Sequence, residues 1–443
     1  GGFDLVVGNP PYVGFHGFDE EKPYYKDAFD CASGRFDLYM LFIEQSLRVL
    51  KSGGLLGFIC PTNFMKRQHG EALRSTLKRG STIVEIVDFK HGRVFADALN
   101  YTCIMILQKS EPSPTHVITY RAESTEASSY GIGQDQLSSS GWVFLSPEAS
   151  PLGDKIKSSK TVPLDSLVDG IEEGIVTGKN DVFVLSGDEA SRIALEPAVI
   201  RSAIQGKQIY RYRVGELPRV LIYPYENVHG KAIPLEESAF AARYPTAYRY
   251  LLSRKNELSG RSYFDRSTKA WYELWNERSY SKQACPKIVV RELATRSTFA
   301  LGDEAQFYLD TVCGIVPRDR REESLYYLLG LLNSSLLNYY YKATTVPKAN
   351  GFFIYKTHFL KQLPIGRVDF DDAGEREMHG HLVRLVERML GLHKRKAELS
   401  LPQSELEDVE RLIDETDCEI DDLVYDLYGL TEEERQVVEG AGR

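Results

Sequence analysis

The chain lacks the features that mark membrane, secreted and metal-binding proteins. No stretch of about 18 consecutive apolar residues occurs in its 443 residues, so we expect no membrane-spanning helix. The six cysteines are scattered without a CxxC pair, and the nine histidines show no ligand spacing beyond His379 and His381, which fall in a charged helical segment. We therefore expect neither a disulfide framework nor a bound metal. No charged and apolar leader stands at its start, and we therefore expect a cytoplasmic protein with reduced thiols.

The chain also lacks a net positive charge, but its acidity is unevenly distributed. The whole sequence has a formal net charge of −9. Residues 1–150 carry −3, residues 151–366 carry +6, and residues 367–443 carry −12. A basic middle region is able to face phosphates, although charge alone does not distinguish such a surface from an ordinary solvated one.

The first 110 residues alternate apolar runs of strand length with runs of helical periodicity. Strands are predicted at residues 5–8, 55–60, 83–89 and 101–107, and helices at 36–51 and 68–79. The helix at 36–51 places Tyr39, Phe42 and Ile43 on one face. This alternation predicts a doubly wound α/β sheet, in which ligands lie at the carboxyl ends of the strands.

The remaining residues indicate further regions of different character. Residues 110–160 are rich in Ser, Thr, Pro and Gly and are expected to form loop and linker. Beyond them we predict strands at 220–223, 287–291 and 307–316, a helix at 325–342, and a charged helical hairpin at 377–430 broken near Pro402. The expected domains are residues 1–145 (α/β), residues 160–366 (α+β) and an acidic helical tail at 367–443.

The sequence Asn9-Pro10-Pro11-Tyr12 follows the first predicted strand and carries the clearest chemistry. The exocyclic amine of adenine is a poor nucleophile because its lone pair is delocalised into the ring. The Asn9 amide oxygen and the Pro10 carbonyl are able to accept its two N–H protons and so favour attack on a methyl sulfonium. Proline holds these acceptors rigidly, because it fixes φ and keeps the preceding residue extended. Tyr12 offers a flat face to a base that has left the duplex.

A simpler interpretation of the same four residues is a turn that ends a strand. The context favours the chemical interpretation, because a strand, a helix, a Gly-Gly strand ending in Pro61 and a segment around Phe95 follow in the expected order.

The chain resembles the amino-group DNA methyltransferases of the adenine-N6 type, as found in TaqI-type and type IIG restriction–modification enzymes. FDLVVGNPPY at 3–12 is similar to their catalytic motif, and FDLYMLFIEQSLRVLKSGGLLGFICP at 36–61 to the helix and strand that follow it. RVFADALNYTCIMIL at 93–107 is similar to their last catalytic-domain motif. The resemblance implies a partial Rossmann-like methyltransferase sheet, followed by an α+β target-recognition domain and a C-terminal helical segment.

The same resemblance assigns roles to individual residues. It implies that Asn9 and Phe42 contact S-adenosyl-L-methionine, with Phe42 stacking on the adenine of that cofactor. It also implies that Phe95 packs against the flipped base opposite Tyr12, with Pro10 and Pro11 completing the catalytic motif. Core packing is the alternative role for Phe42 and for Phe95.

Residues 174–185, GIVTGKNDVFVL, are similar to the opening of the family's target-recognition domain. The segment matches a phosphate-binding loop of nucleotide-binding proteins only weakly, since three residues separate Gly174 from Gly178-Lys179 and Asn180 stands where Ser or Thr is required. Duplex DNA is the expected partner. The predicted DNA contacts are Thr177, Gly178, Lys179, Asn180, Lys207, Arg211 and Lys348.

The chain departs from the family in one large respect. Complete members carry a glycine-rich cofactor loop on strands that precede the Asn-Pro-Pro-Tyr strand, and this sequence contains no such segment. We therefore expect a C-terminal portion of a restriction–modification or phage-defence methyltransferase, inactive by itself and completed by upstream domains or a partner subunit. The alternatives are a DNA-binding specificity module of a fused endonuclease–methyltransferase and a glutamine methyltransferase. The long region at 160–366 argues against the glutamine methyltransferase.

Overall fold

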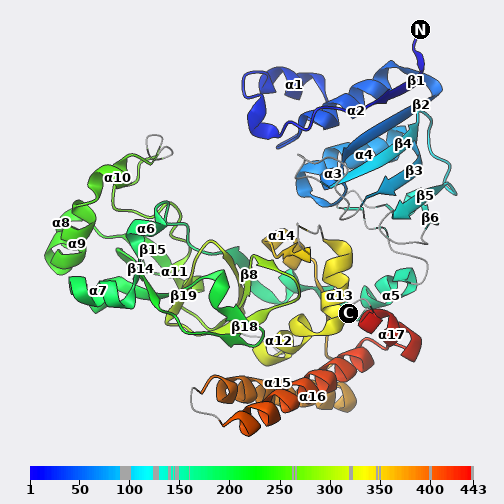
Figure 1. Ribbon diagram of the computed structural model, residues 1–443. Coiled ribbons are helices and arrows are strands. Elements are labelled where there is room, and N and C mark those ends of the chain that lie inside the picture. Colours follow the sequence, from blue (N-terminus) through cyan, green and yellow to red (C-terminus); the bar gives the residue numbers. More distant parts are fainter. Residues whose placement is uncertain are drawn as a thin grey trace. The chain divides into compact units, whose positions relative to one another are not determined.

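The computed structural model describes the chain except for residues 90–100, 123–128, 138–140, 143, 145–148, 159, 262–263, 265–266, 319–322, 346–347, 349–350, 399–401 and 441–443. Its internal contacts divide the chain into two units (Figure 1). Unit 1 comprises Gly1–Asp154 and Lys342–Asn350, and unit 2 comprises Lys155–Tyr341 and Gly351–Arg443. Within the described ranges, no helix combines the length and the apolar character that crossing a membrane requires.

Unit 1 is built on a six-stranded sheet with the strand order β1-β2-β4-β3-β5-β6. The pairs β1–β2 and β3–β5 are parallel, and the other neighbouring pairs are antiparallel. The strands are β1 (Phe3–Gly8), β2 (Leu50–Pro61), β3 (Thr82–Asp88), β4 (Thr102–Gln108), β5 (Val117–Ala122) and β6 (Ser129–Gly133). The helices are α1 (Lys22–Ala28), α2 (Leu38–Val49), α3 (Asn63–Lys66) and α4 (Glu71–Gly80), and α5 (Ala149–Ile156) runs on into unit 2.

The α/β class and the elements predicted before residue 110 are confirmed, with boundaries that differ by a few residues. The prediction of loop for residues 110–160 is wrong where β5 and β6 extend the sheet. In β5 the buried Ile118 and Tyr120 alternate with more exposed neighbours, which is the pattern of a strand buried on one face. A composition rich in Ser, Thr and Gly obscured that short alternation in the sequence.

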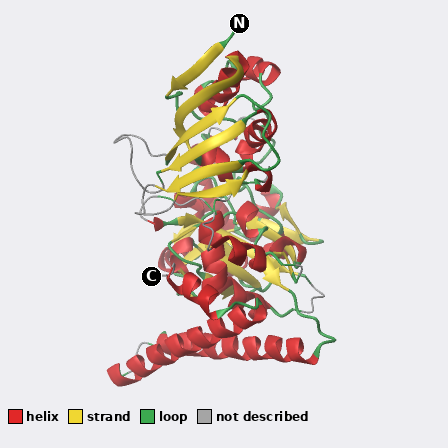
Figure 2. Cartoon of the chain, turned by 90° about the vertical axis from the view of Figure 1, so that its right-hand side faces the viewer, coloured by secondary structure: helices red, strands yellow, loops and turns green. Residues whose placement is uncertain are grey.

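The two faces of this sheet differ. Leu56, Phe58 and Met105 point to one face, are buried, and belong to the core that α2 and α4 help to cover (Figure 2). On the other face Leu5 pairs with Leu55, and both side chains are exposed. The helices of unit 1 therefore pack on one side of the sheet, and apolar side chains line its other side.

Unit 2 combines two four-stranded sheets with small hairpins and helices. One sheet has the order β18-β16-β20-β8 and the other β19-β10-β13-β9. The first consists of β18 (Phe299–Gly302), β16 (Lys287–Arg291), β20 (Val312–Pro317) and β8 (Val168–Glu173), the second of β19 (Gln306–Tyr308), β10 (Ile200–Ile204), β13 (Arg219–Ile222) and β9 (Val184–Ser186). Two-stranded pairs are β11 (Ile209–Tyr210) with β12 (Arg213–Val214), β14 (Tyr225–Val228) with β15 (Lys231–Pro234), β17 (Leu293–Ala294) with β21 (Phe353–Ile354), and β22 (Pro364–Gly366) with β7 (Thr161–Pro163).

The helices of unit 2 are mostly short until the C-terminal part. They are α6 (Asn180–Phe183), α7 (Gly187–Ile193), α8 (Glu237–Arg243), α9 (Pro245–Leu252), α10 (Lys255–Ser259), α11 (Tyr280–Gln283), α12 (Leu325–Asn333), α13 (Ser335–Thr344, ending in unit 1), α14 (Thr357–Leu360), α15 (Ala373–Lys396), α16 (Gln403–Leu427) and α17 (Glu432–Gly440).

Two elements that the sequence predicts as continuous are each divided into two in the structure. The strand predicted at 307–316 is β19 followed by β20, because the chain turns at Leu309–Thr311 and passes from one sheet to the other. The helix predicted at 325–342 breaks at Ser334, whose backbone is extended. Its hydroxyl donates to the Leu331 carbonyl at 2.7 Å and accepts from the Leu337 amide at 3.2 Å, so it ends α12 and caps α13.

The acidic tail forms the predicted helical hairpin, and it packs within unit 2. Helices α15 and α16 run side by side (Figure 2). Gly330 of α12 allows close packing against α15, since a Cβ there would lie 2.9 Å from Val386 and 3.0 Å from Leu382. The Tyr428 hydroxyl donates to the Pro364 carbonyl and accepts from the Gly366 amide, both at 2.8 Å. Specific contacts therefore join the tail to the rest of its unit.

Candidate active site and nucleic-acid interface

The Asn9-Pro10-Pro11-Tyr12 segment begins at the residue after β1. Because β1 and β2 are parallel, their carboxyl ends lie at the same edge of the sheet. Asn9 and Pro11 are exposed at this edge, whereas Pro10 is buried. The Asn9 side chain is thus available to a ligand, on a backbone that the buried proline holds.

Tyr12 joins this segment to the end of β2. Its hydroxyl donates to the Ile59 carbonyl at 3.3 Å, and the side chain is half-buried. Burial, followed by the Cys60 and Cys103 thiols, raises the pKa of Tyr12 to about 12. The ring is therefore neutral at physiological pH and serves as an aromatic surface rather than as a base. Gly8 lies against Phe58, since a Cβ there would lie 3.2 Å from that ring.

Helix α2 is tied to the loop that follows the motif. The Leu38 amide at its first turn donates to the Val13 carbonyl at 2.9 Å. Farther along, the buried Glu44 carboxylate accepts from the amides of Asp30 at 3.0 Å and Cys31 at 2.9 Å. The motif loop and α2 therefore form one rigid arrangement.

Phe42 projects outward from α2. The prediction that it shares a face with Tyr39 and Ile43 is wrong, because those two side chains are fully buried while Phe42 is 45% exposed. Among the described residues, its ring does not belong to the buried core of unit 1. An exposed ring on a helix fixed to the motif loop fits the stacking role that the resemblance implies for a cofactor adenine.

Two further polar side chains near the start of α2 were not identified from the sequence. Asp37 precedes the helix, and a Cβ on Gly14 would lie 3.7 Å from its Oδ1 atom. His69 Nε2 lies 3.9 Å from Asp37 Oδ2, and burial lowers the pKa of this imidazole. Their proximity depends on the fold, because 31 residues separate them in sequence. Phe95, the predicted partner of Tyr12, lies outside the described residues.

In unit 2, the segment Thr177–Asn180 forms a closed turn. The buried Thr177 hydroxyl donates to Asn180 Oδ1 at 2.6 Å and accepts from the Lys179 amide at 3.0 Å. Gly178 has φ +77°, which a side chain disfavours. The Lys179 amide is thus already bonded, and the Lys179 ammonium lies 3.9 Å from Glu257. Only the exposed Asn180 and the partly exposed Lys179 side chain remain available for a DNA contact in this turn.

The other predicted DNA contacts are placed differently from one another. Lys207 is exposed in the turn before β11, and Lys348 is half-buried. Arg211 is mostly buried, forms an ion pair with Asp417 of α16, and donates to the Asn333 carbonyl at 2.8 Å. This guanidinium is engaged within the chain, which leaves it less available to a phosphate than an exposed cation. For Lys207, Lys179 and Lys348 the DNA role stays a prediction.

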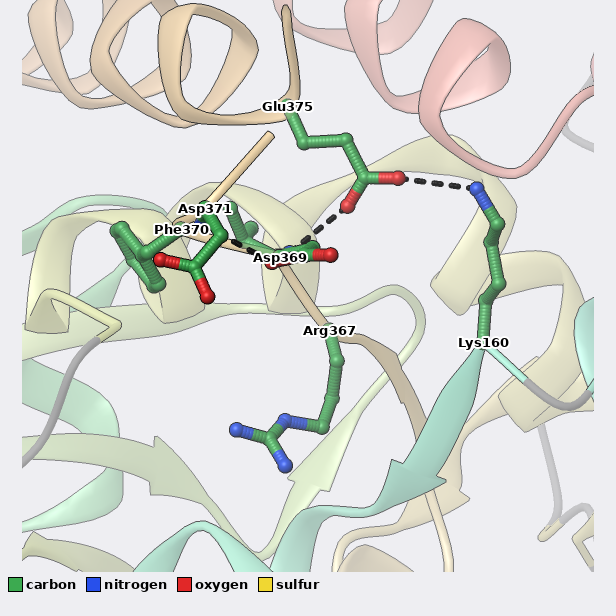
Figure 3. A pocket seen from close by; sticks show the side chains of 7 residues that line it. Lys160, Arg367, Asp369, Phe370, Asp371 and Glu375 are labelled. Carbon is green, nitrogen blue, oxygen red and sulfur yellow. Dashed lines mark hydrogen bonds and ion pairs between the residues drawn. The ribbon is translucent and has the colours of Figure 1, made fainter. Parts of the chain in front are cut away.

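An open cavity of about 570 Å³ lies where β22 meets the start of α15 (Figure 3). Its charged lining residues pair with neighbours inside the unit. Lys160 contacts Glu375 at 2.9 Å, and Arg367 Nε lies 3.4 Å from Glu323. The opposing charges join the start of the tail to the β7–β22 pair, which gives this lining a structural role. Among the described residues, no group of three or more His, Cys, Asp or Glu side chains is arranged to hold a metal ion.

Two parts of the chain match known protein families. Residues 1–95 match the Eco57I restriction-modification methylase family, and residues 201–365 match the TaqI-like C-terminal specificity domain. These matches confirm the resemblance to TaqI-like and type IIG restriction–modification enzymes that the motifs predicted.

Individual relatives point in the same direction. The chain is 25% identical over 421 residues to the type II restriction enzyme and methyltransferase RM.Eco57I of Escherichia coli, a match that covers 85% of this chain and 41% of that protein. It is 24% identical over 407 residues to the type II methyltransferase M.BanIII of Aneurinibacillus aneurinilyticus, covering 82% of this chain and 69% of that protein. The chain thus spans less than half the length of RM.Eco57I.

A solved structure shows the same fold. The type IIL restriction–modification enzyme MmeI, determined in complex with DNA, superposes with a TM-score of 0.65 at 12% sequence identity. The superposition covers 98% of this chain and 56% of that enzyme. The α/β sheet, the α+β region and the helical C-terminal segment therefore recur together in a known architecture.

Proposed function

We propose that this chain contains the catalytic motif and the target-recognition part of a restriction–modification methyltransferase that methylates the N6 amine of adenine in duplex DNA. One observation carries the proposal: Asn9 is exposed at the carboxyl end of β1, between the last strand residue and a buried proline. Related proteins named as type II methyltransferases support it. None of this favours the alternative of a specificity module without chemistry of its own.

The chain's own residues account for activation of the amine. The Asn9 amide oxygen and the Pro10 carbonyl accept the two amine protons, which localises the nitrogen lone pair for attack on the methyl carbon. The buried Pro10 keeps both acceptors oriented before the substrate arrives, so little reorganisation is needed during the reaction. Tyr12, neutral and held by its hydroxyl, provides a flat surface for the extruded base.

The residues present also fit part of a site for S-adenosyl-L-methionine. The exposed Phe42 ring suits stacking on an adenine, and Asn9 lies at the strand end where such a ligand would meet the substrate. When bound, this cofactor supplies an electrophilic methyl group on a sulfonium. The amine proton released after transfer passes to solvent, since no ionisable base is placed by these residues.

Methyl transfer measures the proposal directly. Asn9→Ala in the longest form of the protein that its gene encodes is expected to lower methyl transfer from labelled S-adenosyl-L-methionine to duplex DNA by about 100- to 1,000-fold. Binding of the duplex is expected to change little. Mass spectrometry of the digested DNA identifies N6-methyladenine as the product.

Asn256→Ala provides the matched control, because Asn256 is an exposed asparagine on α10 of unit 2. It should leave the rate unchanged. Product found on the cytosine amine would refute the adenine assignment. A specificity module without chemistry would show no transfer in any form of the protein. The 443-residue chain alone is expected to transfer poorly, and tight, saturable binding of the cofactor to it in calorimetry would contradict that expectation.

A further inference from the structure

The β11–β12 hairpin of unit 2 has an unusual turn. Tyr210 pairs with Arg213, and Arg211 and Tyr212 form the two-residue turn between them. Tyr212 has φ +64°, in the left-handed region that favours glycine. Such a conformation persists only where the surroundings enforce it, and it is found preferentially at sites that bind ligands. The role of this turn therefore depends on the contacts that hold its backbone and on the side chains that flank it.

The acidic tail enforces the turn. The Arg211 guanidinium forms an ion pair with Asp417 of α16 and donates to the Asn333 carbonyl at the end of α12. The Tyr212 side chain is only 2% exposed, and its ring centroid lies 5.9 Å from that of His393 on α15. We call Arg211 and Tyr212 the anchoring pair.

The same turn is also bonded to its own sheet. The Tyr212 amide donates to the Phe299 carbonyl of β18 at 2.8 Å. Phe299 is in turn held by Asn333, whose side chain accepts from its amide at 2.9 Å and donates to its carbonyl at 3.0 Å. Contacts to β18, α12, α15 and α16 thus converge on the anchoring pair.

Of the two residues that flank the anchoring pair, Tyr210 is exposed and Arg213 is half-buried. Tyr210 is 47% exposed, although it is a large aromatic residue. The Arg213 guanidinium carbon lies 4.8 Å from the centre of the Tyr210 ring. We call these two residues the presenting pair. An arginine stacked on an exposed tyrosine offers a phosphate donor beside an aromatic face, a combination that nucleic acids match.

The end of α15 contacts β12, the strand that carries Arg213. Burial, followed by the charges of Arg211, Lys396 and Arg213, lowers the pKa of His393 to about 4. Beside this neutral imidazole, the last turn of α15 carries Lys394, Arg395 and Lys396, of which Arg395 pairs with Glu405 at 3.0 Å and Lys396 with Glu410 at 2.7 Å. Carboxylates of α16 therefore balance most of the positive charge that α15 brings near the hairpin.

The second hairpin of unit 2, β14–β15, shows the contrast. Its turn also contains a non-glycine residue with positive φ, His229 at +51°. The residues around that turn, from Glu226 to Lys231, are largely exposed. The Asn227 side chain accepts from the Gly230 amide at 2.9 Å, and the Ser279 hydroxyl donates to the Gly230 carbonyl at 3.3 Å. Among the described residues, the tail therefore bonds to the turn of β11–β12, whereas the bonds to the turn of β14–β15 come from other parts of unit 2.

We propose that Asp417 of α16 positions the β11–β12 hairpin by holding Arg211, so that Tyr210 and Arg213 contact the backbone of duplex DNA. This inference rests on the proposed function, because it concerns how the target-recognition part meets its substrate. It makes Asp417 a positioning residue and gives the acidic tail a role in DNA binding. It also replaces the direct phosphate contact predicted for Arg211 with an anchoring role.

The first experiment tests the presenting pair. Binding of a fluorescently labelled, mixed-sequence DNA duplex to the 443-residue chain is measured by anisotropy over a series of salt concentrations. Tyr210→Ala and Arg213→Ala are each expected to weaken binding about ten-fold, and Arg213→Ala to reduce the slope of log K against log salt by about one. Lys231→Ala removes an exposed cation from the other hairpin and should leave binding nearly unchanged.

The second experiment tests the positioning role. By electrostatics alone, removing a negative charge from the tail should strengthen DNA binding. Asp414→Asn is the control for this effect, because Asp414 is exposed on α16, and it should leave binding unchanged or strengthen it slightly. Asp417→Asn is expected to weaken binding about ten-fold despite the same change of charge. In the Tyr210→Ala/Arg213→Ala background it should weaken binding no further, because the hairpin is then already without its contacts.

A conservative variant covers the case in which Asp417→Asn does not fold. Arg211→Lys keeps the positive charge but loses the planar fork that serves both Asp417 and the Asn333 carbonyl. It should weaken binding in the same direction by a smaller factor, with an unchanged melting midpoint.

The outcomes separate the inference from the proposed function. If the unaltered chain binds the duplex and the presenting-pair variants bind equally well, the inference is wrong and the proposed function stands. If Asp417→Asn weakens binding further in the doubly substituted background, Asp417 does not act through the hairpin. If the unaltered chain binds no duplex at all, the target-recognition part of the proposed function fails together with the inference.

Discussion

The two units differ in how completely their apolar surfaces are covered. In unit 1, one face of the sheet is packed by helices, while Leu5, Val7 and Leu55 on the other face are exposed among the described residues. In unit 2, two sheets share buried clusters with the short helices, and the acidic tail packs onto the same unit. The candidate catalytic residues thus lie on a sheet with an open face, and the candidate DNA contacts other than Lys348 lie on a closed assembly.

The candidate functional side chains of the two units are also held in place in two different ways. Asn9 is fixed locally, by the strand before it and the proline after it, so a short sequence motif is sufficient to identify it. The presenting pair of Tyr210 and Arg213 is fixed through contacts to Asp417 and His393, which lie roughly two hundred residues away. Sequence motifs therefore reveal the first kind of site and miss the second.

The largest expected effect tests whether the two units unfold separately. Gly174 in unit 2 faces the Leu309 carbonyl, and a Cβ there would lie 2.1 Å from that oxygen. Gly70 in unit 1 stands in the same relation to the Phe64 carbonyl, also at 2.1 Å. Gly174→Ala and Gly70→Ala should each destabilise their own unit by about 3 kcal/mol or more, because backbone atoms must move. Differential scanning calorimetry should show one shifted transition in each variant.

Two other glycines supply the controls for this experiment. A Cβ on Gly57 of β2, or on Gly391 of α15, would meet no atom within 4 Å. Gly57→Ala should leave the unfolding temperature of unit 1 unchanged. Gly391→Ala should raise the free energy of unfolding of unit 2 by up to about 1 kcal/mol, because alanine has the higher helix propensity. A single transition that shifts equally in both clashing variants would show that the units unfold together.

The next largest effect concerns how the tail is attached to unit 2. Asp421 of α16 accepts hydrogen bonds from the Ser335 amide at 2.7 Å and hydroxyl at 2.6 Å. Burial, opposed by these bonds and reinforced by Asp417, raises the pKa of Asp421 from 3.8 to about 6. A carboxyl whose folded-state pKa is raised contributes stability below about pH 4, and that contribution is lost as the pH rises through 6.

Asp421→Asn is therefore expected to stabilise unit 2 at pH 8 by up to about 3 kcal/mol, because the neutral amide avoids burial of a charge. The advantage should shrink as the pH falls from 7 toward 4. Urea denaturation at several pH values measures it. Asp414→Asn, an exposed position on the same helix, should show a pH profile parallel to that of the unaltered chain. Parallel profiles for Asp421→Asn as well would contradict the raised pKa.

The sequence was sufficient to predict most of unit 1. The strands β1 to β4 and helix α2 follow from apolar periodicity, and the exposed Asn9 follows from a strand that ends before two prolines. The outward orientation of Phe42 was not predictable from periodicity, because α2 is apolar on most of its circumference and only the packed core distinguishes its faces. The edge strands β5 and β6 were missed because their composition resembles that of a loop.

Less of unit 2 was predictable, for a different physical reason. Its strands are short and pair across long sequence separations, so a single apolar run at 307–316 serves two sheets. The role of Arg211 depends on Asp417, which is 206 residues away. No local sequence pattern indicates such a distant ion pair. An arginine in a basic region of the sequence is therefore predicted to contact DNA. The tail's attachment was unpredictable for the same reason.

The smallest expected effect sharpens the comparison of the two surfaces. Leu5 of β1 is 58% exposed and lies within an apolar group on the open face, whereas Ile233 of β15 in unit 2 is 42% exposed and lies on a separate hairpin. Leu5→Ser and Ile233→Ser should each change stability by less than about 0.5 kcal/mol, since both side chains remain exposed in the folded chain. Only Leu5→Ser should lower the binding of a hydrophobic dye, because a contiguous apolar surface binds it and a single side chain does not. A loss of about 2 kcal/mol or more for Leu5→Ser would mean that another surface covers this face in solution, and sedimentation at several concentrations would then show whether a second copy of the chain provides it.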